Sequence, residues 1–316
     1  IEKNKKERLY LAVSRFYQLL EKKLISKKNR FELSKIDLFE IKNDFKNKNI
    51  LIAGAAGSIG SQFIKDLIEL NIQPKKIFLL DKDENLITEL NREIVLICKK
   101  KLLNRINIVC SDLTSLNLDN FLFINQITHY LNFAAIKHVR SEENLDSIKY
   151  MIKTNSINFL PKKKHRLQKL FSVSTDKTVN PSSILGITKY LMEINLNEFL
   201  RKNNIFVSSV RFANVSFSNG SILKYATDRI IQKKPFGIPK NIKRFFITHK
   251  EASSLCFKAL LKRNNKKIVV PNPKLLNKDI LIKNMVSKIA RYFGYNPKYV
   301  KTFKKITISK KNYNIL

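Results

Sequence analysis

From residue 49 onward, short apolar runs alternate with longer stretches in which apolar residues recur every three or four positions. The apolar runs have the length of buried strands and lie at Ile50–Ala53, Lys76–Leu80, Ile106–Cys110, His129–Phe133, Leu170–Val173 and Val207–Arg211. The helical stretches lie near 58–71, 84–100, 143–160, 184–203 and 224–233. Such alternation predicts an α/β fold with a doubly wound parallel Rossmann sheet, since each parallel strand needs a crossover to reach the next. The expected strand order is 3-2-1-4-5-6.

The two ends of the chain break this rhythm. Residues 1–45 are typical of a charged helical lead-in, and we expect its apolar stripe to pack on the main domain or on a partner subunit. The stripe is formed by Leu9, Leu11, Val13, Phe16, Leu19 and Leu20. After Phe212, prolines at 235, 239, 271 and 273 punctuate short mixed elements. We therefore predict a lead-in over 1–45, a Rossmann domain over 46–212 and a smaller C-terminal lobe over 213–316.

Composition narrows the class of protein. Of the 316 residues, 44% are hydrophobic, which is enough to bury a core. No apolar run approaches the ~20 residues that cross a bilayer, and the first residues lack the layout of a secretory signal. A cytoplasmic location without a transmembrane segment is therefore expected. Cys98, Cys110 and Cys256 show no Cys-x-x-Cys spacing, so we expect neither a disulfide framework nor a metal site.

The formal net charge is +36, and such a field attracts nucleic acid, anionic lipid or phosphorylated ligands. The lysines are scattered through a chain rich in Lys, Asn and Ile. Scattering favours drift in composition over a selected polyanion site, so no specific nucleic-acid partner is expected. The charge still favours a substrate that carries a diphosphate.

A glycine-rich loop follows the first strand and opens a helix, with Gly54, Gly57 and Gly60 in Gly-x-x-Gly-x-x-Gly spacing around Ser58 and Ile59. In this context Gly54 permits the tight turn, Gly57 lets the backbone approach a pyrophosphate, and Gly60 lets helix and strand pack closely. The helix N-terminus supplies free N–H groups to the phosphates. The loop therefore predicts a dinucleotide site.

Acidic residues after the next two strands indicate which dinucleotide binds. Asp81 ends the second strand, where a carboxylate binds the ribose hydroxyls of the adenosine and repels a 2′-phosphate. Asp112 follows the third strand, in position to contact adenine. Asp81 favours NAD, although Lys82 keeps NADP possible.

Polar residues also gather where the fifth predicted strand ends, at Thr175, Asp176 and Lys177. Ligands of open α/β sheets bind at the carboxyl ends of the strands, and a hydroxyl, a carboxylate and an ammonium there form a plausible acid/base set. Lys189 lies on the following helix, four residues after Leu185. The alternative is a polar strand end that only caps the next turn.

Taken with their order and spacing, these stretches resemble the UDP-N-acetylglucosamine 4,6-dehydratases of bacterial polysaccharide biosynthesis, which are extended short-chain dehydrogenase/reductases. The resemblance covers roughly residues 48–255. The matching stretches are Gly54–Gly60 with Asp81, Ala134–Val139, Ser174–Pro181, Gly186–Lys189, Val210–Val215 and Arg244–Thr248. The Thr-Asp-Lys triplet followed by Asn-Pro is more selective than the glycine loop.

The resemblance implies a role for each matching residue. NAD is bound by the loop, Asp81, Asp112, Ala134, Ala135 and Lys189, and it takes a hydride from C4 of a UDP-sugar and returns it to C6. Asp176 and Lys177 share removal of the C5 proton and protonation of the departing 6-hydroxyl, while Thr175 binds near O4. Substrate contacts fall to Lys137, His138, Asn214 and Arg244, so the 213–316 lobe is expected to bind mainly substrate. Lys137 is a second candidate acid/base. Relatives imply a homo-oligomer.

The chain departs from the family at positions that bear on activity. Leu185 stands where the superfamily usually has tyrosine, which leaves the base for the C4 hydroxyl unassigned. The crossover between Asn155 and Ser174 is shorter than expected and is interrupted by Pro161. Beyond Lys137 and His138, the stretch 140–143 matches only one branch of the family.

Two other functions stay open from the sequence. A sugar-nucleotide 4-epimerase or reductase would use the same cofactor site but usually needs the missing tyrosine. A non-catalytic Rossmann protein that binds nucleotide or nucleic acid would explain the charge and Leu185. It would not require Asp176, Lys177 and Lys189, and the 4,6-dehydratase is therefore preferred.

Overall fold

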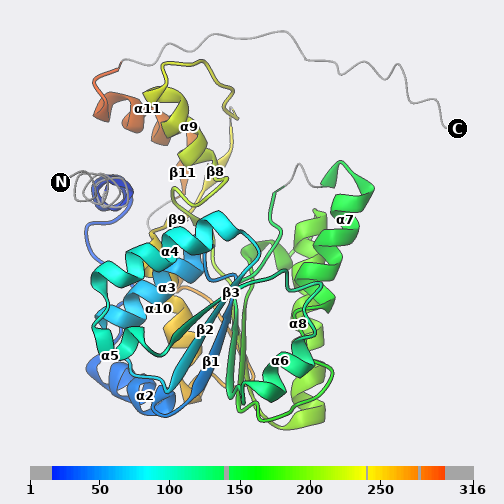
Figure 1. The fold of residues 1–316 in the computed structure, drawn as a ribbon. Helices are drawn as coiled ribbons and strands as arrows, with labels where there is room; N and C mark the ends of the chain where they lie inside the picture. The colour runs from blue at the N-terminus through cyan, green and yellow to red at the C-terminus, as the bar shows by residue number, and fades with distance from the viewer. Residues whose placement is uncertain (1–15, 139–141, 240, 277–278, 296–316) are drawn as a thin grey trace, which may run out of the picture.

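The computed structural model describes residues 16–138, 142–239, 241–276 and 279–295 (Figure 1). A seven-stranded parallel sheet forms its centre, in the order β10-β6-β5-β4-β1-β2-β3. The strands are β1 Asn49–Ala53, β2 Lys76–Asp81, β3 Ile106–Cys110, β4 His129–Asn132, β5 Lys169–Val173, β6 Phe206–Val210 and β10 Lys267–Val269. The predicted doubly wound α/β fold and strand order are confirmed, and β10 extends the sheet beyond β6.

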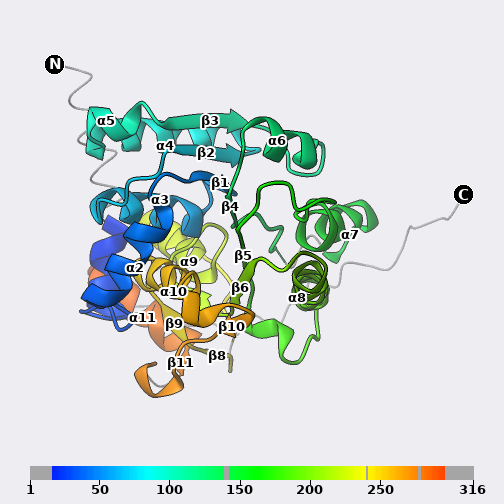
Figure 2. The same cartoon turned by 90° about the horizontal axis from the view of Figure 1, so that it is seen from below.

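Helices cover both faces of the sheet (Figures 1 and 2). One face carries α2 Lys35–Phe45, α3 Ser58–Glu69, α4 Glu84–Ile97, α5 Lys100–Leu103 and α10 His249–Ala259. The other face carries α6 Leu118–Ile124, α7 Leu145–Ile152 and α8 Ile184–Asn203. Strand β1 contributes alternate residues to the two cores, Ile50 and Ile52 to the first and Leu51 and Ala53 to the second. Burial on both faces explains why its sequence is continuously apolar.

A smaller lobe stands beyond the carboxyl ends of the strands (Figure 1). It contains α9 Ile222–Ile231, α11 Ile282–Tyr292 and two short sheets. These sheets pair β8 Lys243–Arg244 with β11 Ile280–Leu281, and β7 Asn214–Val215 with β9 Phe246–Ile247. Between β9 and β11, the chain returns to the main sheet through α10 and β10.

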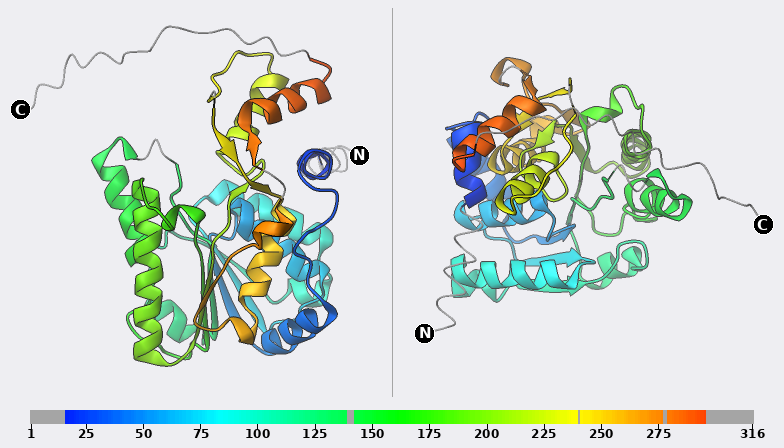
Figure 3. Two further views of the ribbon diagram at one scale, coloured as in Figure 1. Left: turned by 180° about the vertical axis from the view of Figure 1, so that it is seen from behind. Right: turned by 90° about the horizontal axis from the view of Figure 1, so that it is seen from above.

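The helical residues 16–24 pack against this lobe within the chain (Figure 3). Leu20 is fully buried in a cluster that includes Leu223 of α9 and Met285 of α11. Glu21 accepts hydrogen bonds from the Ser216 hydroxyl at 2.6 Å and from the His249 ring at 2.7 Å. Of the expected apolar stripe, Phe16 and Leu20 pack on the smaller lobe of this chain, whereas Leu19 is exposed. Leu9, Leu11 and Val13 lie outside the described residues.

The crossover that leads to β5 begins with a helix whose last turn is irregular. Helix α7 runs into a wider π-type turn, Lys153–Ile157, which ends before Pro161. Asn155 in this turn is fully buried, and its side chain bonds both the backbone of Ile136 and the Thr188 hydroxyl on α8. Such turns are frequent at functional sites, and here the turn ties the loop after β4 to α8.

Candidate functional site

The glycine loop lies between the end of β1 and the start of α3, close against the end of β4. Gly54 has φ +72°, and a Cβ there would lie 2.4 Å from the Ala134 backbone nitrogen. A Cβ on Gly60 would lie 2.3 Å from the Gly54 carbonyl oxygen. Gly57 caps α3 without a side-chain hydrogen bond and leaves the first turn of Ser58 and Ile59 with free N–H groups. This is the geometry that receives a pyrophosphate.

Asp81 lies beside this loop, as the sequence predicts. Its carboxylate accepts hydrogen bonds from the Ala56 N–H at 2.9 Å and the Asp83 N–H at 3.2 Å. Ala134 and Ala135 follow β4 on the other side of the loop, and the Ala134 N–H donates to the Asn132 side chain at 3.1 Å. The carboxylate and the two small residues therefore flank the loop from neighbouring strands.

Asp112 lies one strand further along, after β3. It accepts hydrogen bonds from the Thr114 N–H at 2.7 Å and hydroxyl at 2.8 Å, and a short one from the Tyr150 hydroxyl of α7. Burial alone would raise the pKa of Asp112, but these hydrogen bonds outweigh it and hold the pKa below its usual value. Asp112 is therefore a negatively charged hydrogen-bond acceptor that follows β3, the strand next to the one that ends at Asp81.

The candidate acid/base residues form a compact cluster at the end of β5. Thr175 caps the short 3₁₀ turn Asp176–Thr178, and its hydroxyl donates to the Asp176 carboxylate at 2.9 Å. The Lys177 ammonium lies 3.3 Å from the same carboxylate. Both side chains of this ion pair are roughly half exposed, 48% for Asp176 and 41% for Lys177. Proton donor and acceptor are thus adjacent and open to a ligand.

Lys189 lies beneath this cluster on α8, as predicted. Its ammonium donates to the Val173 carbonyl at 2.9 Å, and burial lowers its pKa to about 8 although the charge of Glu193 opposes this. Leu185 begins the same helix with a buried side chain, and its N–H donates to the Glu142 carboxylate at 3.1 Å. Leu185 therefore fills this position with an apolar side chain that has no proton to transfer.

Sequence reasoning missed Glu193, one turn after Lys189 on α8. This buried carboxylate accepts hydrogen bonds from the Ser174 hydroxyl at 2.6 Å and from the Arg211 guanidinium at 2.8 Å and 2.5 Å. It therefore joins the ends of β5 and β6 to the helix that carries Lys189. The signal in the sequence is the four-residue spacing of Lys189 and Glu193, which places both on one helix face.

Replacing Glu193 by glutamine should move the alkaline limb of the activity profile to lower pH. The Glu193 carboxylate raises the pKa of Lys189 against burial, so removing its charge lowers that pKa further. If charged Lys189 is required, turnover falls as pH rises through about 8 in the parent and at lower pH in the variant. Rate measured against pH checks this. Glu198→Gln on the exposed side of the same helix serves as the control. If the alkaline limb of the activity profile is the same in Glu193→Gln as in the parent, Glu193 does not tune Lys189 for activity.

The predicted substrate residues of the loop after β4 lie near the smaller lobe. Lys137 and His138 are both exposed, and surrounding protein atoms lower the pKa of the Lys137 ammonium by desolvation. The ring of His138 lies against Gly220, where an added Cβ would come within 1.8 Å of it. This contact brings the loop after β4 to the segment that precedes α9.

Asn214 and Arg244 lie in the smaller lobe itself. The Asn214 amide donates to the carbonyl of Phe245 at 3.4 Å, which puts Asn214 beside the residue after Arg244. Arg244 is exposed, and its guanidinium donates to the carbonyl of Lys243 at 3.0 Å. Asn219 reaches across to the loop, where its N–H donates to the Ser58 hydroxyl at 2.9 Å. The lobe thus contacts the start of α3.

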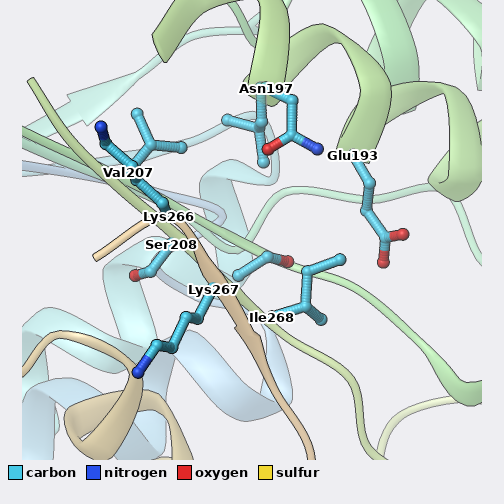
Figure 4. A pocket seen from close by; sticks show the side chains of 9 residues that line it. Glu193, Asn197, Val207, Ser208, Lys266, Lys267 and Ile268 are labelled. Atoms are coloured by element: carbon cyan, nitrogen blue, oxygen red, sulfur yellow. The ribbon is translucent and has the colours of Figure 1, made fainter. Parts of the chain in front are cut away.

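Two hollows elsewhere do not coincide with this strand-end site. The one in Figure 4 lies between α8 and strands β6 and β10 and has a volume of about 10 Å³, room for a single water molecule. Glu193 lines it, together with Asn197, Ser208 and Lys267. A larger hollow of about 810 Å³ lies along α6 and the segment 157–165 and shares no residue with the site. The candidate site therefore rests on the strand-end residues and on neither hollow.

Over the described ranges, no three His, Cys, Asp or Glu side chains are grouped to hold a metal ion. Within the same part of the chain, every helix is too short or too polar to span a bilayer.

The residues present fit a dinucleotide. A Cβ would fill the cradle at Gly54 and Gly60, the N-terminus of α3 faces it, and Asp81 stands beside it. Together with the strand order and the lysine of α8, these features define the extended short-chain dehydrogenase/reductase class.

Within this class, the chain belongs to the family described as polysaccharide biosynthesis protein, whose model matches residues 50–311. It is 32% identical to an uncharacterized membrane protein of Methanocaldococcus jannaschii over 82% of this chain and 76% of that one. It is 30% identical to the capsular polysaccharide biosynthesis protein CapD of Staphylococcus aureus over 71% of this chain. An inverting UDP-N-acetylglucosamine 4,6-dehydratase of Campylobacter jejuni is 28% identical over 60% of this chain and 55% of that one.

A solved structure of similar fold is that of a UDP-glucuronic acid 4-epimerase of Bacillus cereus in complex with NAD. Its TM-score is 0.69 at 18% identity, and the match covers 80% of this chain and 85% of that one. The chain spans only 38% of the length of the Staphylococcus aureus relative. These similarities establish the family and the fold of the chain.

Proposed function

We propose that the chain is an NAD-dependent 4,6-dehydratase of a UDP-N-acetylhexosamine, best matched by UDP-N-acetylglucosamine. The product is a 4-keto-6-deoxy sugar for surface polysaccharide or glycan biosynthesis. The observation that carries the proposal is the Asp176–Lys177 ion pair at 3.3 Å, exposed at the end of β5 above buried Lys189. The Campylobacter jejuni relative supports the reaction and substrate.

Bound NAD would accept a hydride from C4 of the sugar and return it to C6. The chain's residues handle the protons in between. Once C4 is a ketone, the C5 proton is acidic, and the Asp176 carboxylate is placed to remove it. The Lys177 ammonium gives a proton to the 6-hydroxyl, which leaves as water when the C6–O bond breaks. After the hydride reaches C6, the proton held by Asp176 returns to C5. The O4 proton, released to solvent when C4 is oxidised, balances the proton that Lys177 regains from solvent, so one water has been lost in all.

Positioning residues complete the site. The Thr175 hydroxyl, which donates to the Asp176 carboxylate, would bind near O4. Charged Lys189 would hold the nicotinamide ribose. Asn214 and Arg244 would supply amide and guanidinium donors to the diphosphate of the sugar nucleotide.

A 4-epimerase is the second candidate, because the Bacillus cereus enzyme shares the fold. Leu185 counts against it, since an epimerase of this class usually removes the O4 proton with the tyrosine that leucine replaces. An epimerase needs no acid for the 6-hydroxyl and leaves the Asp176–Lys177 pair without a task.

Purified protein incubated with UDP-N-acetylglucosamine, without added cofactor, should release a product lighter by one water. We expect this because a hydride returned within each turnover gives the protein no reason to release NAD. Mass spectrometry of the sugar nucleotide follows the reaction, and denaturing the same sample identifies the bound nucleotide. A product of unchanged mass but altered C4 stereochemistry would favour the epimerase. Binding of NAD and UDP-sugar without any reaction would favour a non-catalytic Rossmann protein. The altered crossover near Pro161 would then be the first candidate cause of the lost activity.

A further inference from the structure

Lys82 directly follows Asp81 at the end of β2 and is the residue that kept NADP open. A cation in this neighbourhood is what a 2′-phosphate on the adenosine ribose requires. In the structure, however, the Lys82 ammonium lies 2.9 Å from the Tyr150 hydroxyl and 4.6 Å from the centre of the Tyr150 ring. The lysine is therefore already engaged by α7.

Lys82 and Asp81 reach in opposite directions. The Asp81 carboxylate bonds the glycine loop through the Ala56 N–H, on the side of α3. The Lys82 ammonium reaches Tyr150 on α7, which covers the other face of the sheet (Figures 1 and 2). Asp81 is the last residue of β2 and Lys82 lies in the bend that follows, so the two side chains leave the strand end toward different helices. The carboxylate is thus directed at the ribose site and the ammonium away from it.

Tyr150 is itself held in place. Its hydroxyl donates to Asp112, and Asp112 is fixed by two hydrogen bonds from Thr114. The next residue of α7, Met151, is fully buried and anchors the helix turn that carries the tyrosine. Tyr150 therefore presents an oxygen whose proton is committed to Asp112 and whose lone pair accepts from Lys82.

We propose that Tyr150 is a specificity-determining residue, which holds the Lys82 ammonium away from the 2′-oxygen of the adenosine ribose and so selects NAD over NADP. The inference rests on the proposed dinucleotide cofactor and deepens it. Asp81 repels a 2′-phosphate, and Tyr150 withholds the nearby cation that would neutralise it.

Graded variants test this through binding. Each protein is equilibrated with equal excess concentrations of NAD and NADP, separated from free nucleotide, and denatured to measure the bound ratio. Tyr150→Phe removes the oxygen but keeps the ring, and Tyr150→Leu removes both. We expect Tyr150→Leu to raise the bound NADP:NAD ratio about tenfold, the scale of one charge-assisted hydrogen bond, with Tyr150→Phe between it and the parent.

Lys82→Met supplies the control. In the Tyr150→Leu background it should return the ratio to the parent value, whereas alone it should change the ratio by less than about threefold, because the ammonium is already withheld. An unchanged ratio in Tyr150→Leu overturns the inference, even if total nucleotide binding falls, since a merely structural tyrosine affects both nucleotides equally. A parent protein that binds neither nucleotide would instead overturn the proposed cofactor, and the inference with it.

Discussion

Asp176→Asn should reduce the rate of water loss from the sugar nucleotide by about 10²-fold or more, the usual contribution of a positioned acid or base. The amide keeps the shape of the carboxylate and cannot take the C5 proton. Lys177→Met keeps the stem and removes the ammonium, and a similar loss is expected. Both side chains are roughly half exposed at the strand end, so the free energy of unfolding should change little. Turnover is measured by mass spectrometry and stability by urea unfolding.

A matched control is the exposed Glu198–Lys202 pair near the end of α8. Glu198→Gln and Lys202→Met make the same chemical changes away from the strand ends and should leave turnover unaltered. Arg244→Ala should instead weaken substrate binding first, because its guanidinium is assigned to the diphosphate. Near-normal dehydration by both Asp176→Asn and Lys177→Met would show that the residue assignment is wrong, whatever the fold.

Gly54→Ala should destabilise the protein by about 3 kcal/mol and abolish dinucleotide binding. At φ +72° an L side chain costs about 1–2 kcal/mol. The added Cβ would also lie 2.4 Å from the Ala134 backbone, and such overpacking costs about 1–3 kcal/mol more. Urea unfolding gives the stability, and release of bound nucleotide gives the binding.

Gly57→Ala separates the two effects. Gly57 has φ −64°, and the nearest atom to its added Cβ is the Gly54 carbonyl oxygen at 3.2 Å. The fold should therefore tolerate the alanine, at a cost below about 1 kcal/mol. NAD binding should still weaken, because the methyl group stands between the backbone and the pyrophosphate. Equal stability of the two variants would argue against the close packing of Gly54 on β4.

The strand periodicity predicted the main sheet closely, and the reason is physical. Parallel strands buried on both faces are continuously apolar, so β1 and β5 are visible in the sequence without tertiary information. Short helices such as α6, by contrast, escaped prediction. Its seven residues are too few to establish a 3.6-residue period.

The candidate site was located from the sequence because its residues follow strands. Gly54, Asp81, Asp112 and Asp176 each lie within three residues of the end of an apolar run, and the carboxyl ends of parallel strands meet at one edge of a sheet. Their roles in catalysis and binding remain predictions. The first glycine of the loop is recognisable in the sequence because the tight turn at position 54 admits only a residue without a Cβ.

What the chain's own sequence determined, then, is the α/β class, the order of the strands and the edge at which the candidate residues gather, since these depend on periodicity and on residues adjacent along the chain. Tertiary structure alone decided the partners that come from distant segments. Glu193 meets Arg211, Lys82 meets Tyr150, and Leu20 packs in the smaller lobe. Each contact joins elements brought together by helix packing and strand crossover. No local pattern encodes such contacts, because side chains from distant segments come into contact only when the elements that carry them pack together.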